Sequence, residues 1–317
     1  MRVLFAGSPP LAVASLESVH RRHSLAAVLT NPDRPAGRRG EPVATPVKSC
    51  ALELGLRVLQ PTHLDAAAIE EVGALGCDLL AVVAYGKIFP REFLELFPRG
   101  GVNLHPSLLP RHRGPSPITA AILAGDEETG VSVQRLAPRM DSGDVLRVHR
   151  ISLTGRETTG SLSEALGRLG AELLAETLAD VEAGLDAGQP QVEADATYCR
   201  LVRKEDGRID WRLAADDIER RIRAYDPWPG AFTTFRGQVL HLLAGGVCSV
   251  EAPAAPSNPR QGLVLGTDNR YGILVQTGRG ILYAARLQLQ SKKPADWRAF
   301  LNGQRGFVGS LLGVNDD

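Results

Sequence analysis

The chain has 317 residues, of which 44% are hydrophobic and 23% charged, and 36 Lys and Arg balance 36 Asp and Glu. This length exceeds that of one typical domain, and it predicts two domains. The formal net charge of zero gives no global sign of a polyanionic partner, so any nucleic-acid surface would have to be a local patch.

The start of the chain, MRVLFAGSPP, passes from an apolar run directly into a turn, which predicts no signal peptide. No apolar run approaches the roughly 18 residues of a membrane-spanning helix, so we expect no membrane segment. The four cysteines form no C-x-x-C pair and predict reduced thiols in a cytoplasmic protein, with neither disulfides nor zinc; they are Cys50, Cys77, Cys199 and Cys248.

Short apolar runs alternate with amphipathic stretches through the first half of the chain. This alternation predicts right-handed βαβ units, and therefore a mostly parallel, Rossmann-like α/β sheet. The GSPP turn after the first strand lacks G-x-G-x-x-G, so a nicotinamide dinucleotide is not expected. Strands are predicted at 2–6, 25–30, 78–85, 101–105 and 131–137, with helices at 11–22, 47–55, 118–125 and 158–184.

Composition changes near 184–208, where a polar, aperiodic stretch is typical of a linker. A helix at 213–225 then precedes closely spaced alternating runs, which predict a small antiparallel β-barrel or sandwich. The predicted organisation is a catalytic domain at 1–185, a linker at 186–207 and a small C-terminal domain at 208–317.

The most informative segment is N-L-H-P-S-L-L-P-R-H-R-G, residues 103–114, followed by M-D-S-G-D at 140–144. Asn103 and His105 are two apart on a predicted strand, so their side chains share one face at the edge of a loop. An amide and an imidazole there can donate to an oxyanion, and a neutral imidazole can instead remove a proton. Asp141 is the expected partner that orients the ring and stabilises its charged form.

Other interpretations of these residues have less support. Ser107 as a nucleophile lacks a G-x-S-x-G elbow. A metal site made of His105, His112, Asp141 and His149 lacks any recognised ligand spacing, so no metal is expected. The segment 30–48 is interpreted as a long structureless connection that is either a phosphate-binding loop or a solvated one; its basic residues are Arg34, Arg38, Arg39 and Lys48.

The combined motifs resemble enzymes that transfer or release the formyl group of 10-formyltetrahydrofolate. Further blocks, including FAGSPPLAVASL, PDRPAGR, VVAYGKIFP and IRAYDPWPGAFT, resemble the methionyl-tRNA formyltransferase family along nearly the whole chain. The resemblance implies formyl transfer to initiator methionyl-tRNA in translation initiation, with an OB-like C-terminal barrel that carries part of the tRNA surface. It also implies a monomer, with 10-formyltetrahydrofolate as co-substrate.

Residue by residue, Asn103, His105 and Asp141 match the family's catalytic trio, and Arg38 matches the arginine of its tRNA loop. The positions that match folate contacts are Ser107, Leu108, Leu109, Pro110, Tyr85, Gly86 and Ile88. Four positions depart from the pattern. Gly40 and Glu41 stand where relatives often carry a second basic pair, so the loop lacks that pair, and His112 and Pro106 also differ.

Two other functions remain open from the sequence. A hydrolase that deformylates the same folate with water would need neither the 30–48 loop nor a tRNA domain. A noncatalytic RNA-binding module on an α/β scaffold would leave the Asn103, His105 and Asp141 constellation unexplained.

Overall fold

The structure is a computed structural model that describes residues 1–36, 41–249 and 260–314. The chain forms two compact units. The first comprises 1–118, 127–153 and 161–200, and the second comprises 119–126, 154–160 and 201–317.

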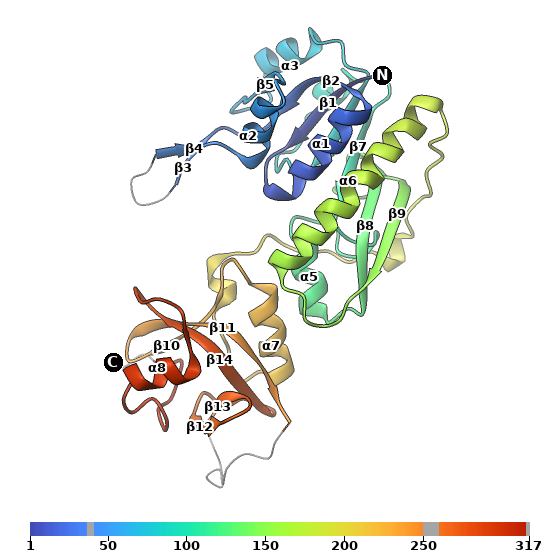
Figure 1. Cartoon of the computed structure of the whole chain (residues 1–317). Helices are drawn as coiled ribbons and strands as arrows, with labels where there is room; N and C mark the ends of the chain where they lie inside the picture. Colours follow the sequence, from blue (N-terminus) through green and yellow to red (C-terminus); the bar gives the residue numbers. More distant parts are fainter. Residues whose placement is uncertain (37–40, 250–259, 315–317) are drawn as a thin grey trace. The chain divides into compact units, whose positions relative to one another are not determined.

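In the first unit, strands alternate with helices from the N-terminus onward (Figure 1). The strands are β1 (Arg2–Gly7), β2 (Ser24–Leu29), β3 (Arg34–Ala36), β4 (Glu41–Val43), β5 (Val58–Leu59), β6 (Leu79–Val83), β7 (Gly101–His105), β8 (Glu128–Arg135) and β9 (Val145–Ser152). The helices up to residue 183 are α1 (Val13–Arg22), α2 (Pro46–Glu53), α3 (Ala66–Gly73), α4 (Arg91–Leu94), α5 (Pro117–Ala124) and α6 (Thr159–Ala183), of which α5 belongs mostly to the second unit and α6 begins in it.

Seven of these strands form one sheet in the order β5-β2-β1-β6-β7-β8-β9, counted over the described residues. The pairings from β5 to β7 are parallel, and those of β8 with its two neighbours are antiparallel. The mostly parallel α/β fold expected from the sequence is therefore confirmed. From β1 the chain first adds β2 and β5 on one side and then crosses to add β6 and β7 on the other side. Ligands of open α/β sheets bind in the crevice at the point where the strand order changes in this way.

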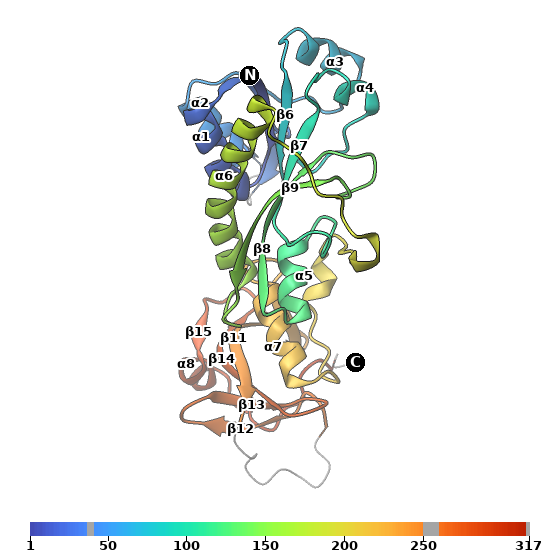
Figure 2. The same cartoon turned by 90° about the vertical axis from the view of Figure 1, so that its right-hand side faces the viewer.

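Helices cover both faces of this sheet. On one face α3 and α4 pack through Val72 and Phe93 against Leu80 and Val82 of β6, all of them buried. On the other face α1 and α6 lie side by side, and Ser18 donates a hydrogen bond to Glu172 over 3.0 Å (Figure 2). Because both faces are covered, the central strands are apolar on both sides, as the continuous run LLAVV of β6 shows.

The segment 30–48 differs from the structureless connection that its composition predicts. Strands β3 and β4 pair antiparallel, with Arg34 opposite Val43, and α2 begins at Pro46. Thr45 caps α2 by accepting from the Lys48 backbone N–H at 3.1 Å. Strands of three residues that include proline carry no readable alternation, which is why the sequence does not predict this hairpin.

The second unit contains α7 (Ala215–Ala224) and a small antiparallel sheet. Its strands run in the order β10-β11-β14-β13-β12, and β15 pairs with β14. Residues 310–314 hydrogen-bond to Val264 of β12, to Gly262 just before it and to Thr234 of β10, so the C-terminal segment bridges the two outer strands. The bounds are β10 (Ala231–Phe235), β11 (Gln238–Cys248), β12 (Val264–Asp268), β13 (Gly272–Gln276), β14 (Ile281–Leu289), β15 (Ala295–Asp296) and α8 (Trp297–Gly303).

The core of the second unit is built from alternate residues of these strands. Leu240, Leu242 and Leu287 point inward and are at most 2% exposed. Ile218 and Ile222 of α7 pack on the same cluster. Burial of alternate strand residues against one helix gives the barrel-like domain that the spacing of the runs predicts.

Candidate active site

The strand β7 presents Asn103 and His105 on one face, as their spacing requires. Asn103 lies opposite Gln134 of β8, and His105 lies opposite Ser132. Asn103 is half-buried, whereas His105 is only 4% exposed. The sheet therefore fixes both side chains at the end of a strand, where the chain leaves for the loop 106–116.

Asp141 reaches these residues from a turn that follows β8. Its backbone has a φ of +51°, a left-handed conformation that is uncommon for residues other than glycine. Its Oδ1 accepts from Gln134 at 3.0 Å and from Asn103 at 3.4 Å, and its Oδ2 accepts from the Gly114 N–H at 2.8 Å. The structure thus brings Asn103 and His105 together around the Asp141 carboxylate.

The two nitrogens of His105 have different surroundings. Nε2 lies 2.9 Å from the carbonyl oxygen of His112, and because a carbonyl only accepts, Nε2 carries the proton. Nδ1 lies 3.6 Å from Oδ2 of Asp141, beyond a direct hydrogen bond. In the neutral ring Nδ1 therefore holds the lone pair, and a proton added there would make an ion pair with Asp141.

Burial of the imidazole lowers the pKa of His105, although the Asp141 charge and the His112 carbonyl act in the opposite direction. At neutral pH the ring is therefore uncharged and able to accept a proton. A histidine held neutral by burial, next to a carboxylate that stabilises its charged form, suits a general base.

The depressed pKa of His105 also makes a prediction about stability. The unfolded chain binds a proton near the ordinary histidine pKa of about 6.5, and the folded chain binds it only at lower pH. The free energy of unfolding should therefore be greatest above pH 6.5 and decrease as the pH falls below it. Urea unfolding at pH 7.5 and 5.5 measures this, and in His105→Asn the decrease should be smaller; an equal decrease would contradict it.

The loop 106–116 is held by its own hydrogen bonds. Ser107 is fully buried, and its hydroxyl donates to the Arg111 carbonyl at 2.6 Å. Ser132 donates to the Ser107 carbonyl at 2.7 Å, and the Leu109–Pro110 peptide bond is cis. The Ser107 hydroxyl is thus used inside the loop, which gives no support to a nucleophilic role. Leu108, Leu109 and Pro110 are partly exposed, so they can contact a ligand.

The segment that follows β6 contains three of the residues expected to bind folate. Tyr85 is 1% exposed, and its hydroxyl has no hydrogen-bond partner among the residues that the structure describes; burial raises the pKa of Tyr85 to about 12. The ring stacks on Phe89, so the side chain is core, and only its backbone can face a ligand. Gly86 has a φ of +82°, and a Cβ built there would lie 4.0 Å from Nδ2 of Asn31; Ile88 is 85% exposed.

The residues expected to bind tRNA differ in their surroundings. Arg38 and Arg39 lie outside the described residues. Arg34 is exposed on β3. Lys48 instead pairs with Asp33 at 2.7 Å, and hydrogen bonds from Gln60 and then Lys48 lower the pKa of that carboxyl. The Lys48 ammonium is therefore engaged at the base of the hairpin.

Three residues that the sequence does not single out surround the Asp141 turn. Gln134 is 2% exposed and Arg113 is not exposed at all, and both contact Gln191. Gln191 belongs to the segment predicted to be a linker. A buried polar side chain has no distinctive sequence pattern, and the only signal for these three is the second arginine of R-H-R-G.

No group of three or more His, Cys, Asp or Glu side chains suited to a metal ion occurs within residues 1–36, 41–249 and 260–314. His149, a metal ligand by residue type, is exposed on β9. All four cysteines are free thiols. In the same ranges, no helix is long and apolar enough to cross a bilayer.

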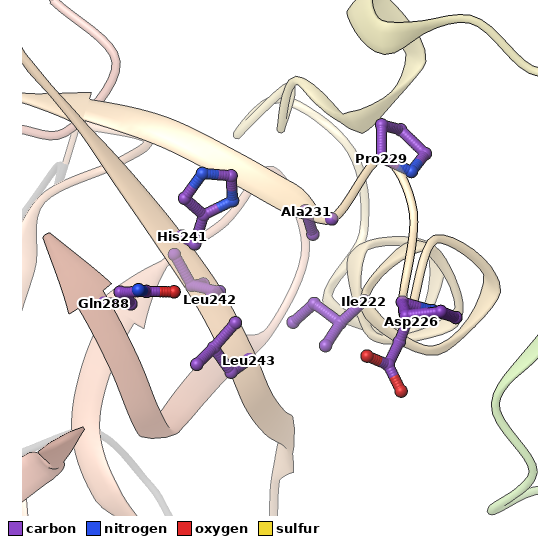
Figure 3. A pocket seen from close by; sticks show the side chains of 10 residues that line it. Ile222, Asp226, Pro229, Ala231, His241, Leu242, Leu243 and Gln288 are labelled. Atoms are coloured by element: carbon purple, nitrogen blue, oxygen red, sulfur yellow. The ribbon is translucent and has the colours of Figure 1, made fainter. Parts of the chain in front are cut away.

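The second unit has a cavity of about 170 Å³ at the end of α7 (Figure 3). His241 and Gln288 are opposed on β11 and β14 and line one side, and Asp226 lies at the other. Burial, and then the Lys204 charge, lower the pKa of His241. All ten lining residues belong to the second unit, and none of them is among the residues described around Asp141.

Comparison with known proteins decides the family. Residues 1–178 match the formyl transferase family and residues 201–305 match the formyl transferase C-terminal domain. Methionyl-tRNA formyltransferase of Treponema denticola is 43% identical, over 97% of this chain and 98% of its own length. That of Roseiflexus castenholzii is 46% identical, over 99% of both chains. The chain belongs to the methionyl-tRNA formyltransferase family.

Solved structures agree with this fold. Methionyl-tRNA formyltransferase from Clostridium thermocellum superposes with a TM-score of 0.56 at 16% identity, covering 79% of this chain and 95% of the other. HypX from Aquifex aeolicus in complex with tetrahydrofolic acid gives 0.62 at 19% identity, over 98% of this chain and 48% of its own. These two likenesses concern the fold of the family.

Proposed function

We propose that this chain transfers the formyl group of 10-formyltetrahydrofolate to the α-amino group of methionyl-initiator tRNA. The observation that carries the proposal is the likeness to methionyl-tRNA formyltransferases over nearly the whole chain, including both domains. Asn103, His105 and Asp141 lie together near the end of β7, and their side chains are groups suited to this chemistry.

In the proposed reaction, the amine of methionyl-tRNA attacks the formyl carbon. A tetrahedral intermediate forms, and the Asn103 amide donates a hydrogen bond to its oxyanion. His105 accepts the amine proton at Nδ1, and the resulting imidazolium is stabilised by Asp141 and by its hydrogen bond to His112. The bond to N10 of the folate then breaks, and N10 takes a proton from His105, which restores the neutral ring.

Two physical effects supply most of the expected acceleration. Alignment of the two substrates contributes on the order of 7–11 kcal/mol at best. An oxyanion donor such as Asn103 contributes about 3–4 kcal/mol. Asp141 accepts from Asn103 before substrate binds, so the amide is already oriented for its role.

The donor folate is assigned to the space bordered by the segments 85–88 and 107–110. Gly86 has no side chain to cover its backbone, and Ile88 offers an exposed apolar side chain. Tetrahydrofolic acid is bound in the HypX structure, whose fold this chain shares. We assign Tyr85 a role through its backbone, because its ring is buried in the core.

The tRNA is assigned to the hairpin β3–β4 and to the second unit. The basic residues proposed here are Arg34, Arg38, Arg39 and Lys48, of which Arg34 is an exposed cation on the described part of the hairpin. The domain limits 1–185, 186–207 and 208–317, a cytoplasmic location and a monomeric state belong to the same proposal.

Arg34→Ala tests the hairpin's part in this assignment. We expect a several-fold increase in the KM for tRNA at nearly unchanged kcat, because a phosphate contact adds binding without chemistry. The slope of log affinity against log salt should fall by roughly 0.9. Arg91→Ala, which removes an equally charged exposed arginine from α4, is the control. Equal effects of the two variants would reject the assignment.

One assay separates the proposal from its rivals. The purified chain is given labelled 10-formyltetrahydrofolate with charged initiator tRNA, with charged elongator tRNA or with no tRNA. Formyl-methionyl-tRNA formed from the initiator supports transfer. Free formate released without tRNA would favour the hydrolase, and salt-sensitive tRNA binding with no formylated product would favour the RNA-binding module.

A further inference from the structure

The segment 191–199 lies against the loop 106–116, and an almost continuous set of hydrogen bonds joins the two. Both segments belong to the first unit. Thr197 accepts from the His112 N–H at 2.8 Å through its hydroxyl and from the Arg113 N–H at 2.9 Å through its carbonyl. Cys199 in turn donates its N–H to the Arg113 carbonyl at 2.8 Å. Although its composition is that of a linker, this segment forms part of the wall of the candidate site.

Arg113 is the buried centre of this contact. Its guanidinium donates through Nε and Nη2 to Oε1 of Gln191, at 3.1 and 3.0 Å. Nη1 donates to Glu193 at 2.9 Å and to the Tyr198 hydroxyl at 2.8 Å. A guanidinium has donors only, so it fixes which end of the Gln191 amide faces it.

The orientation of Gln191 determines the orientation of the next amide. With Oε1 bound to Arg113, the Nε2 group of Gln191 donates to the backbone carbonyls of Asp141 at 2.9 Å and Gly143 at 2.7 Å. It also lies 3.3 Å from Oε1 of Gln134. The side-chain oxygen of Gln134 thus faces Gln191, and Nε2 of Gln134 donates to Oδ1 of Asp141 at 3.0 Å.

We propose that Gln191 is a positioning residue for the reaction, which through Gln134 and the carbonyls of the Asp141 turn holds the Asp141 carboxylate against His105 and Asn103. The inference rests on the proposed function. Nothing in the mechanism requires Gln191 to touch a substrate. Its action is to hold the left-handed turn at Asp141, which is strained without such support, and to select one orientation of the Gln134 amide.

The main test is Gln191→Met, which keeps the length of the side chain and removes both its donors and its acceptor. We expect kcat to fall about 10- to 100-fold while the KM for 10-formyltetrahydrofolate changes less than about threefold. Gln189→Met is the matched control, since Gln189 is exposed and, within the described part of the chain, forms only backbone hydrogen bonds, to Val145. A kcat equal to that of the control would overturn the proposal.

Two further readouts distinguish positioning from general destabilisation. In Gln191→Met the acid limb of the kcat profile should move to lower pH, because a displaced Asp141 no longer favours the charged form of His105. In an Asp141→Asn background the same substitution should change kcat less than about threefold, since the group through which it acts is already lost. An unmoved limb, or an equal loss in both backgrounds, would overturn the proposal.

Gln191→Glu covers the case in which the methionine variant folds poorly. Glutamate keeps an acceptor for Arg113 but cannot donate to the turn or to Gln134. We expect a folded protein with a loss of turnover similar to that of Gln191→Met, and normal turnover would overturn the inference. Normal turnover in Asp141→Asn alone would instead reject the catalytic role of Asp141, so failure of the inference and failure of the proposed function give different results.

Discussion

His105→Ala is expected to lower kcat at least about a hundredfold while leaving tRNA affinity nearly intact. The substitution removes the group that takes the amine proton in the proposed reaction, and general base catalysis typically contributes 10²–10⁴-fold. Asn103→Ala should cost a similar factor through the lost oxyanion donor. Single-turnover formylation at saturating substrates measures both.

His149→Ala is the control for this prediction, because that histidine is exposed on β9 of the same sheet. It should retain near-normal turnover. If either His105→Ala or Asn103→Ala also retained near-normal turnover, the assignment of the catalytic residues would be rejected. A parallel loss of tRNA affinity would point to a folding defect instead, which circular dichroism would reveal.

Gly114→Ala is expected to lower both the stability and the turnover of the protein. Gly114 has a φ of +114°, and a Cβ built there would lie 2.2 Å from the Cys199 carbonyl oxygen. The backbone conformation alone costs about 1–3 kcal/mol for an alanine, and the close contact adds to it. A loss of about 2 kcal/mol corresponds to roughly 4–8 °C in Tm for a unit of this size.

Turnover should also fall in Gly114→Ala, because the Gly114 N–H donates to Oδ2 of Asp141 at 2.8 Å. Gly55→Ala separates the two causes, since Gly55 has a φ of +69° but nothing within 4 Å of the added atom. It should lose stability through the backbone conformation alone and keep full turnover. Equal losses of Tm in the two variants would mean that the contact with Cys199 is unimportant.

Local patterns are sufficient for the larger part of the fold. The run at 78–85 contains β6, the run at 101–105 is β7, and the long amphipathic stretch forms α6. The sequence predicts these elements because a strand and a helix each impose their own period on the apolar and polar residues of one segment. The two-residue period of a strand is also what places Asn103 and His105 on the same face of β7.

The antiparallel strand β9 and the short helix α4 are not predicted by local patterns. In β9, the residues VLRVHRIS are partly or fully exposed, so neither face is consistently apolar and the alternation is weak. Helix α4 has only four residues, fewer than a periodic pattern needs.

By itself, the sequence determined the alternation of strands and helices, and it predicted two domains and the side chains proposed to perform the chemistry. Only the tertiary structure shows which polar residues hold Asp141 and the loop 106–116 in place. Arg113 meets Gln191, Glu193 and Tyr198 about 80 residues later in the chain. The composition of a polar segment does not tell whether its groups bond to water or to another segment, because both satisfy the same donors and acceptors.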